Sequence, residues 1–164
     1  MSSNIQTEAT NKRVVIASDH AGVELKEALV ALLKKRNLEV DDIGAHSTEP
    51  SDFADYAHQV ASKVQSGECA RGILICGTGV GMAITANRHP GVRAVNCSEP
   101  FSARSSREHN NSNVLALGAR VLGVGLALEI AGVWLDTAFS GDERHVRRIA
   151  KIDCTSDSPR QSKE

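Results

Sequence analysis

The sequence predicts an α/β fold in which five parallel strands are covered by helices on both faces. Short β-branched runs alternate along the chain with segments whose apolar residues recur at helical spacing. The most strand-like run is RGILIC (71–76). Aromatic residues make up only 3% of the 164-residue chain. The core must therefore be built from Val, Ile, Leu and Ala, which suits a sheet buried between helices.

The alternation places each element. We expect strands at 13–18, 38–44, 71–76, 92–97 and 113–118. We expect helices at 22–37, 52–67, 80–87, 98–109, 124–139 and 142–153. The polar ends lack periodicity, so residues 1–12 are predicted to be a disordered tail and residues 154–164 a polar tail. Residues 13–153 then form one domain, a length that suffices for a single core.

Composition argues against several classes of protein. A net charge of −1 and scarce aromatic residues do not favour a nucleic-acid-binding surface. The chain has no run of about 18 apolar residues and no apolar stretch of signal-peptide length, so we expect a cytoplasmic protein without a membrane span. The four cysteines are expected to be free thiols. Because no Cys/His cluster has zinc spacing, neither a metal nor a cofactor is expected.

The third predicted strand ends in an unusual loop, Cys76-Gly77-Thr78-Gly79-Val80-Gly81. Parallel sheets bind ligands beyond the carboxyl ends of their strands. The glycines allow backbone N–H groups to point inward as a nest for negative charge, which would favour the Cys76 thiolate. A base, a hydroxyl and an oxyanion nest together suit proton removal next to a carbonyl. The alternative is a tight turn with a buried cysteine.

The same loop matches a dinucleotide-binding loop only in part. The GxGxxG spacing fails because GTGVG is followed by Met82, and Val95-Asn96 stand where an acidic residue would be expected. A Walker motif is excluded because the chain contains no Gly-Lys-Ser/Thr. A non-enzymatic nucleotide-binding regulatory module is therefore the weaker interpretation. Retention of a bound nucleotide through purification would support this module, whereas turnover of a carbonyl substrate would support the enzyme.

Two further polar segments flank predicted strands. Asp19 and His20 follow the first strand, where they could orient hydroxyl groups and bind an anion, although Asp19 could simply cap a helix. His109 and Asn110 precede the fifth strand and supply donors and a titratable ring, or form an ordinary loop. Neither segment decides the function alone.

Near the C-terminus, Arg144 and Arg148 lie one helical turn apart and share a face. Two guanidinium groups on one face form a good phosphate clamp. A solvated basic helix end is the alternative interpretation, and the role of His145 between them stays open.

Together and in this order, these features resemble the ribose-5-phosphate isomerase B family, which includes the galactose-6-phosphate isomerase subunits. The resemblance runs from about Val14 to Asp153 and is carried by SDHAG (18–22), GILICGTGVGMAITANR (72–88), CSEPFSARSSREHNNSNVLALGAR (97–120) and RHVRRI (144–149). It implies a Rossmann-like three-layer αβα sandwich. It also implies a homodimer or homotetramer with the active site between subunits, and metal-free interconversion of ribose 5-phosphate and ribulose 5-phosphate in the pentose phosphate pathway.

The resemblance also implies residue roles. Cys76 is similar to the base that moves a proton between C1 and C2, and Thr78 and His109 to the pair that opens the sugar ring. Met82 stands where a second branch of the family has a catalytic Glu, so the chain resembles the cysteine branch. The implied binding residues are Gly77, Gly79 and Gly81 for the enediolate, Asp19 and Asn110 for hydroxyls, and His20, Arg144, Arg148 and Arg120 for phosphate.

One departure concerns the substrate. The family often has Asp-Tyr-Pro where this chain has Asp52-Phe53-Ala54, and Phe53 has no hydroxyl to donate. Isomerisation of a hexose 6-phosphate or a tetrose phosphate is therefore an alternative activity. In the galactose-6-phosphate enzyme the catalytic residues are divided between two different chains. Here one chain carries them all, which favours a homo-oligomer.

Overall fold

The computed structural model describes residues 12–154 and contains the predicted sheet of five parallel strands, in the order β2-β1-β3-β5-β4. The strands are β1 (Arg13–Ser18), β2 (Glu39–Asp42), β3 (Arg71–Cys76), β4 (Ala94–Asn96) and β5 (Val114–Gly118). The helices are η1 (His20–Gly22), α2 (Val23–Lys35), α3 (Phe53–Gln65), α4 (Val80–Ala86), α5 (Pro100–Asn110), α6 (Val124–Asp136) and α7 (Glu143–Ile152). The predicted tails lie outside the described residues, apart from Lys12 and Cys154.

Several elements end one to three residues earlier than the sequence predicts, and for two of them the local reason is visible. The second strand stops at Asp42 because the Asp42 carboxylate accepts a hydrogen bond from the N–H of Gly44, whose φ of 114° closes a turn. The helix expected over 124–139 ends at Asp136, since Thr137 is extended. Its apolar sequence continues, but the chain leaves the core there.

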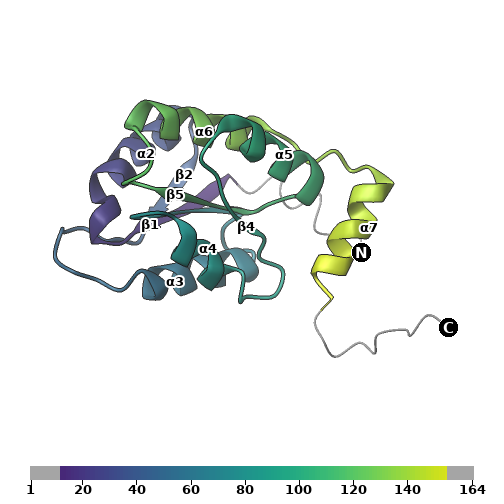
Figure 1. Cartoon of the computed structure of the whole chain (residues 1–164), viewed down its shortest axis with the longest axis horizontal. Coiled ribbons are helices and arrows are strands. Elements are labelled where there is room, and N and C mark those ends of the chain that lie inside the picture. The colour runs from purple at the N-terminus through teal and green to yellow at the C-terminus, as the bar shows by residue number, and fades with distance from the viewer. Residues whose placement is uncertain (1–11, 155–164) are drawn as a thin grey trace.

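Helices cover both faces of the sheet and complete three layers (Figure 1). Side chains alternate along β3: Ile73 and Ile75 pack with α2 and α6 on one face, while Leu74 and Cys76 pack with α3 and α4 on the other. Trp134 of α6 is fully buried and donates its indole N–H to the Ser112 hydroxyl at 2.8 Å, so it is a core residue. Only α7 lies beside these layers, next to α5 (Figure 1).

The strand order places two strand ends side by side. β1 pairs with β3, and Ser18 stands opposite Ile75 at their carboxyl ends. From β1 the chain leads outward to β2, and from β3 it leads to the other half of the sheet. The switch point therefore lies between β1 and β3, where a sheet of this type opens a crevice for ligands.

Close packing of α3 on β3 allows a test of the fold. A Cβ atom on Gly72 would lie 2.6 Å from Cγ1 of Val60. We expect Gly72→Ala to reduce the free energy of unfolding by about 1–3 kcal/mol, measured by urea denaturation. In the control Gly125→Ala, where nothing lies within 4 Å of the added Cβ, stability should hold or rise by roughly 0.5–1 kcal/mol. Equal stability of both variants would contradict this packing.

Candidate active site

The loop between β3 and α4 surrounds the sulfur of Cys76. Cys76 is the last residue of β3 and is 5% exposed. The backbone N–H of Gly79 donates to its Sγ at 3.1 Å. Gly79 has a φ of 81°, and a Cβ there would lie 2.7 Å from the Asn96 side-chain oxygen, so only glycine fits. A donor aimed at the sulfur stabilises negative charge on it, which is the property a thiolate base requires.

Asp19 and His20 lie at the neighbouring strand end. The N–H of Asp19 donates to the Ile75 carbonyl at 3.0 Å, which fixes the end of β1 against the end of β3. Asp19 is 6% exposed, and its carboxylate accepts from the N–H of Ala21 at 2.9 Å. The capping role that the sequence left open is therefore present. This cap uses one of the two carboxylate oxygens of Asp19. Asp19 also lies next to the end of β3, where Cys76 stands.

The His20 ring is oriented by Ser51. The backbone N–H of Ser51 donates to Nδ1 of His20 at 3.2 Å, and the N–H of His20 donates to the Ser51 hydroxyl at 3.1 Å. Because Nδ1 accepts, a neutral ring carries its proton on Nε2 and presents that N–H as a donor. Sequence reasoning missed Ser51 as an orienting residue. The pairing joins segments 31 residues apart, so no local pattern in the sequence indicates it.

Arg120, Thr78 and Phe53 complete this group. The Arg120 side chain lies against Gly77, and its Cδ is 3.4 Å from the position that a Cβ on Gly77 would take. The backbone N–H of Arg120 donates to the Gly77 carbonyl at 3.0 Å. Thr78 is exposed, and its hydroxyl accepts from the N–H of Val80 at 3.3 Å. The half-exposed Phe53 ring covers Gly81, where a Cβ would lie 2.6 Å from Cε2.

His109 and Asn110 lie at the other end of the sheet from Cys76, where the amino ends of the parallel strands are. They are the last residues of α5, which starts after the carboxyl end of β4 and leads back to the amino end of β5. Eleven helical residues span about 16 Å. Within one chain, then, the structure does not bring His109 or Asn110 to Cys76, and the predicted ring-opening pair of Thr78 and His109 is separated.

The arginines of α7 lie with His109. Arg144 and His145 line the same surface hollow as His109, and the two imidazole rings are 4.5 Å apart. His145 is 4% exposed, and its Nδ1 is hydrogen-bonded to the Ser140 hydroxyl at 2.8 Å. Burial, with smaller contributions from His109 and Arg144, lowers the pKa of His145. His145 therefore anchors α7, while Arg144 and Arg148 are exposed.

The remaining candidate ligands form no metal site. Within residues 12–154, no group of three or more His, Cys, Asp or Glu side chains is arranged to hold a metal ion. Cys69 and Cys97 are buried free thiols, whereas Cys154 is exposed. His58 and His89 are joined at the surface by a 2.8 Å hydrogen bond. No helix in the described part of the chain is long and apolar enough to cross a membrane.

Comparison with known proteins identifies the family. Residues 14–152 match the model of the ribose/galactose isomerases. The chain belongs to this family. It is 50% identical to ribose-5-phosphate isomerase B of Escherichia coli over 86% of this chain and 94% of that one. It is 43% identical to D-erythrulose-4-phosphate isomerase of Pectobacterium atrosepticum over 78% of this chain and 85% of that one.

A solved structure of the family confirms the predicted fold. Ribose-5-phosphate isomerase B of Clostridium thermocellum superimposes with a TM-score of 0.84 at 50% identity, covering 86% of this chain and 95% of that one. The Rossmann-like αβα sandwich and the sugar-phosphate isomerase family that the sequence indicates are both established by these matches.

The environment of the cysteines predicts their reactivity. Burial raises the pKa of both Cys69 and Cys97 to about 11, which leaves each a thiolate fraction roughly 100-fold smaller than that of a free thiol. In a Cys154→Ser background, we expect iodoacetamide to label Cys76 at least tenfold faster than either, as followed by peptide mass spectrometry. A sugar phosphate should slow that labelling. Equal labelling of all three cysteines would contradict a stabilised Cys76 thiolate.

Proposed function

We propose that the chain interconverts D-ribose 5-phosphate and D-ribulose 5-phosphate by proton transfer through an enediolate, with Cys76 as the base. The observation that carries this proposal is the Gly79 N–H directed at the Cys76 sulfur in a glycine-lined loop. The 50% identity to the E. coli ribose-5-phosphate isomerase B supports the same substrate. No metal or cofactor takes part in the proposed steps.

The proposed chemistry balances with one base. The Cys76 thiolate removes the proton from C2 of the open-chain aldose, and the electron pair moves through the carbonyl to give an enediolate. Backbone N–H groups around Gly77, Gly79 and Gly81 are suited to stabilise that oxyanion. The proton of the C2 hydroxyl passes to the C1 oxygen, and the Cys76 thiol returns the carbon-bound proton to C1, which gives the ketose and regenerates the thiolate. Met82 is fully buried in the core and cannot replace the thiolate as a base.

The other residues bind and open the sugar. Thr78 and His109 are proposed to move the proton that opens the furanose ring, and Asp19 and Asn110 to bind hydroxyls. His20 can donate from Nε2 to the phosphate, because Ser51 occupies its Nδ1. Arg120, Arg144 and Arg148 supply positive charge for the same group, and charge-assisted hydrogen bonds of this type contribute about 1.5–3 kcal/mol each.

Such a site requires a second copy of the chain, because one copy holds the two residue groups at opposite edges of its sheet. Large apolar side chains are exposed on the helices that follow the carboxyl ends of β3 and β4: Val80 on α4 is 49% exposed, Ile84 on α4 62% and Phe101 on α5 71%. Exposed apolar side chains of this size are typical of a subunit interface. We propose a homodimer, or a homotetramer built from it, in which His109, Asn110, Arg144 and Arg148 of one copy complete the Cys76 site of the other.

A tetrose phosphate is the second candidate substrate. The 43% identical Pectobacterium relative is a D-erythrulose-4-phosphate isomerase. Phe53 narrows the site beside Gly81 with an apolar ring instead of a hydroxyl donor. A shorter sugar leaves fewer hydroxyl groups to satisfy there, so the substitution is compatible with this substrate. A hexose 6-phosphate, which is longer than a pentose phosphate, is a further candidate substrate. A non-enzymatic nucleotide-binding module would isomerise none of these sugar phosphates.

The function is tested by assaying ribose 5-phosphate, erythrose 4-phosphate and allose 6-phosphate in the presence of EDTA. We expect the highest kcat/KM for ribose 5-phosphate, together with incorporation of solvent deuterium at the carbon-bound position. Cys76→Ala should keep the fold and lose both activities, because no base remains. Cys69→Ala is the matched control, and it should incorporate solvent deuterium into the substrate at the wild-type rate. Wild-type exchange in Cys76→Ala would remove Cys76 from the mechanism, and turnover that stops with EDTA would overturn the metal-free route.

A further inference from the structure

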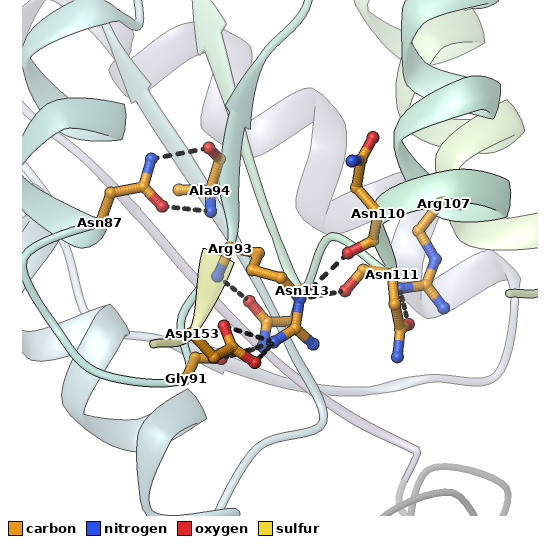
Figure 2. A network of polar contacts seen from close by, with 9 residues as sticks. All are labelled: Asn87, Gly91, Arg93, Ala94, Arg107, Asn110, Asn111, Asn113 and Asp153. Carbon is orange, nitrogen blue, oxygen red and sulfur yellow. Dashed lines mark hydrogen bonds and ion pairs between the residues drawn. The ribbon is translucent and has the colours of Figure 1, made fainter. Parts of the chain in front are cut away.

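Arg93 is the centre of a network of polar contacts (Figure 2). It directly precedes β4 and so lies at the amino end of that strand, whereas Cys76 lies at the carboxyl end of β3. The Nε of Arg93 donates to the carbonyl oxygens of Asn110 at 3.0 Å and Asn111 at 3.1 Å. Its Nη1 lies 3.2 Å from the Asp153 carboxylate in an ion pair. One guanidinium group therefore holds the end of α5 and the end of α7 together.

The backbone of Arg93 is itself held firmly. Its N–H donates to the Asn113 side-chain oxygen at 2.7 Å, and its carbonyl accepts from the N–H of Asn113 at 3.0 Å. The next residue, Ala94, is bonded through both its N–H and its carbonyl to the side chain of Asn87, each at 2.8 Å (Figure 2). The guanidinium group thus projects from a segment that is tied to both α4 and β5.

Helix α7 has few other attachments. His145 is its only buried residue and fixes the start of the helix against His109. Ile149 is half-buried, and the remaining residues of the helix are exposed. At the far end, Asp153 meets Arg93. Arg144 directly precedes the His145 attachment and Arg148 lies between it and Asp153, so loss of the Asp153 attachment would free the helix that carries both arginines to move relative to His109.

We infer that Arg93 is a positioning residue that holds the end of α5 and helix α7 as one rigid unit, so that His109, Asn110, Arg144 and Arg148 reach the partner copy's Cys76 in a fixed arrangement. The inference rests on the proposed function for its kinetic consequences. The guanidinium touches no reacting atom and is separated from its own chain's Cys76 by the length of the sheet. It acts through the geometry of the residues that it joins.

The two branches of the network can be separated. The bonds to Asn110 and Asn111 use Nε and main-chain carbonyls, whereas the bond to α7 is a part-exposed ion pair, with Arg93 at 16% and Asp153 at 39% exposure. Asp153→Asn removes the charge from the α7 branch alone. Arg93→Lys keeps a charge for Asp153 but lacks the fork that reaches two carbonyls. Arg93→Met removes both branches.

The inference predicts a division between binding and turnover. Asp153→Asn should raise KM for the sugar phosphate, and weaken inhibition by inorganic phosphate, each about fivefold, the upper end for a part-exposed ion pair. Its kcat should stay within about twofold, because α5 keeps its hold on His109. Arg93→Met should reduce kcat as well as raise KM. Arg93→Lys should keep KM near that of the wild type but reduce kcat.

Arg88→Met is the matched control. Arg88 is an exposed arginine in the preceding turn, and its side chain forms no hydrogen bond or ion pair with any of residues 12–154, so its replacement should leave KM and kcat unchanged. Hydrogen–deuterium exchange provides a readout independent of activity. Amides of residues 146–152 should exchange faster in Asp153→Asn than in the wild type, while those of β3 should not change.

Each outcome bears on one claim. If the wild-type chain isomerises no sugar phosphate, the proposed function fails, and the exchange of the α7 amides still decides whether Arg93 holds the helix. If the wild type is active but Asp153→Asn shows wild-type KM, phosphate inhibition and α7 exchange, the inference is overturned. Should Arg93→Met fail to fold, Asp153→Asn and Arg93→Lys carry the test.

Discussion

The direction of the chain in a parallel sheet is the constraint on which the site depends. Every crossover helix must lead from the carboxyl edge of the sheet back to its amino edge. Residues at the end of such a helix therefore lie one strand length from residues at the end of a strand. Cys76 ends β3, whereas His109 ends α5. The two groups of polar residues that we propose to serve one reaction are thus held apart by the same topology that makes the core.

This separation is useful because each group has its own rigid support. The Cys76 loop needs little more than the switch point between β1 and β3, with Gly79 adopting a backbone that other residues would strain to adopt. The His109 group is supported by the buried His145, by Ser140 and by Arg93. In the proposed dimer each copy would supply a prearranged half, and little further ordering would be required to complete the site.

Much of the fold and half of the site could be predicted from the sequence. Residue 76 was expected at the end of a strand because RGILIC has the apolar, β-branched character of a buried parallel strand, and its bounds in the structure agree. The glycine spacing then indicated the nest. Strand β4 was expected to be longer, but Arg93 and Cys97 pair outside the regular ladder, leaving three residues.

The supporting contacts were out of reach for a different reason. Ser51 meets His20 across 31 residues, and Asp153 meets Arg93 across 60. Neither pair leaves a periodic signal, since each is created by the way helices return across the sheet. Local patterns predict elements and the loops between them. Which polar residues of distant loops touch is decided by tertiary packing, so the orienting shell of the site appears only in the structure.

Mixed oligomers test the shared site most directly. Cys76→Ala and His109→Ala chains, each carrying a different tag, are inactive alone in this account. When they are unfolded together, refolded and allowed to assemble at random, hybrids contain one site with both residues intact, so the mixture should recover about a quarter of wild-type activity. Purified hybrids should show about half. Hybrids that form but stay inactive, or either single variant retaining wild-type activity, would contradict the claim that one copy completes the other's site.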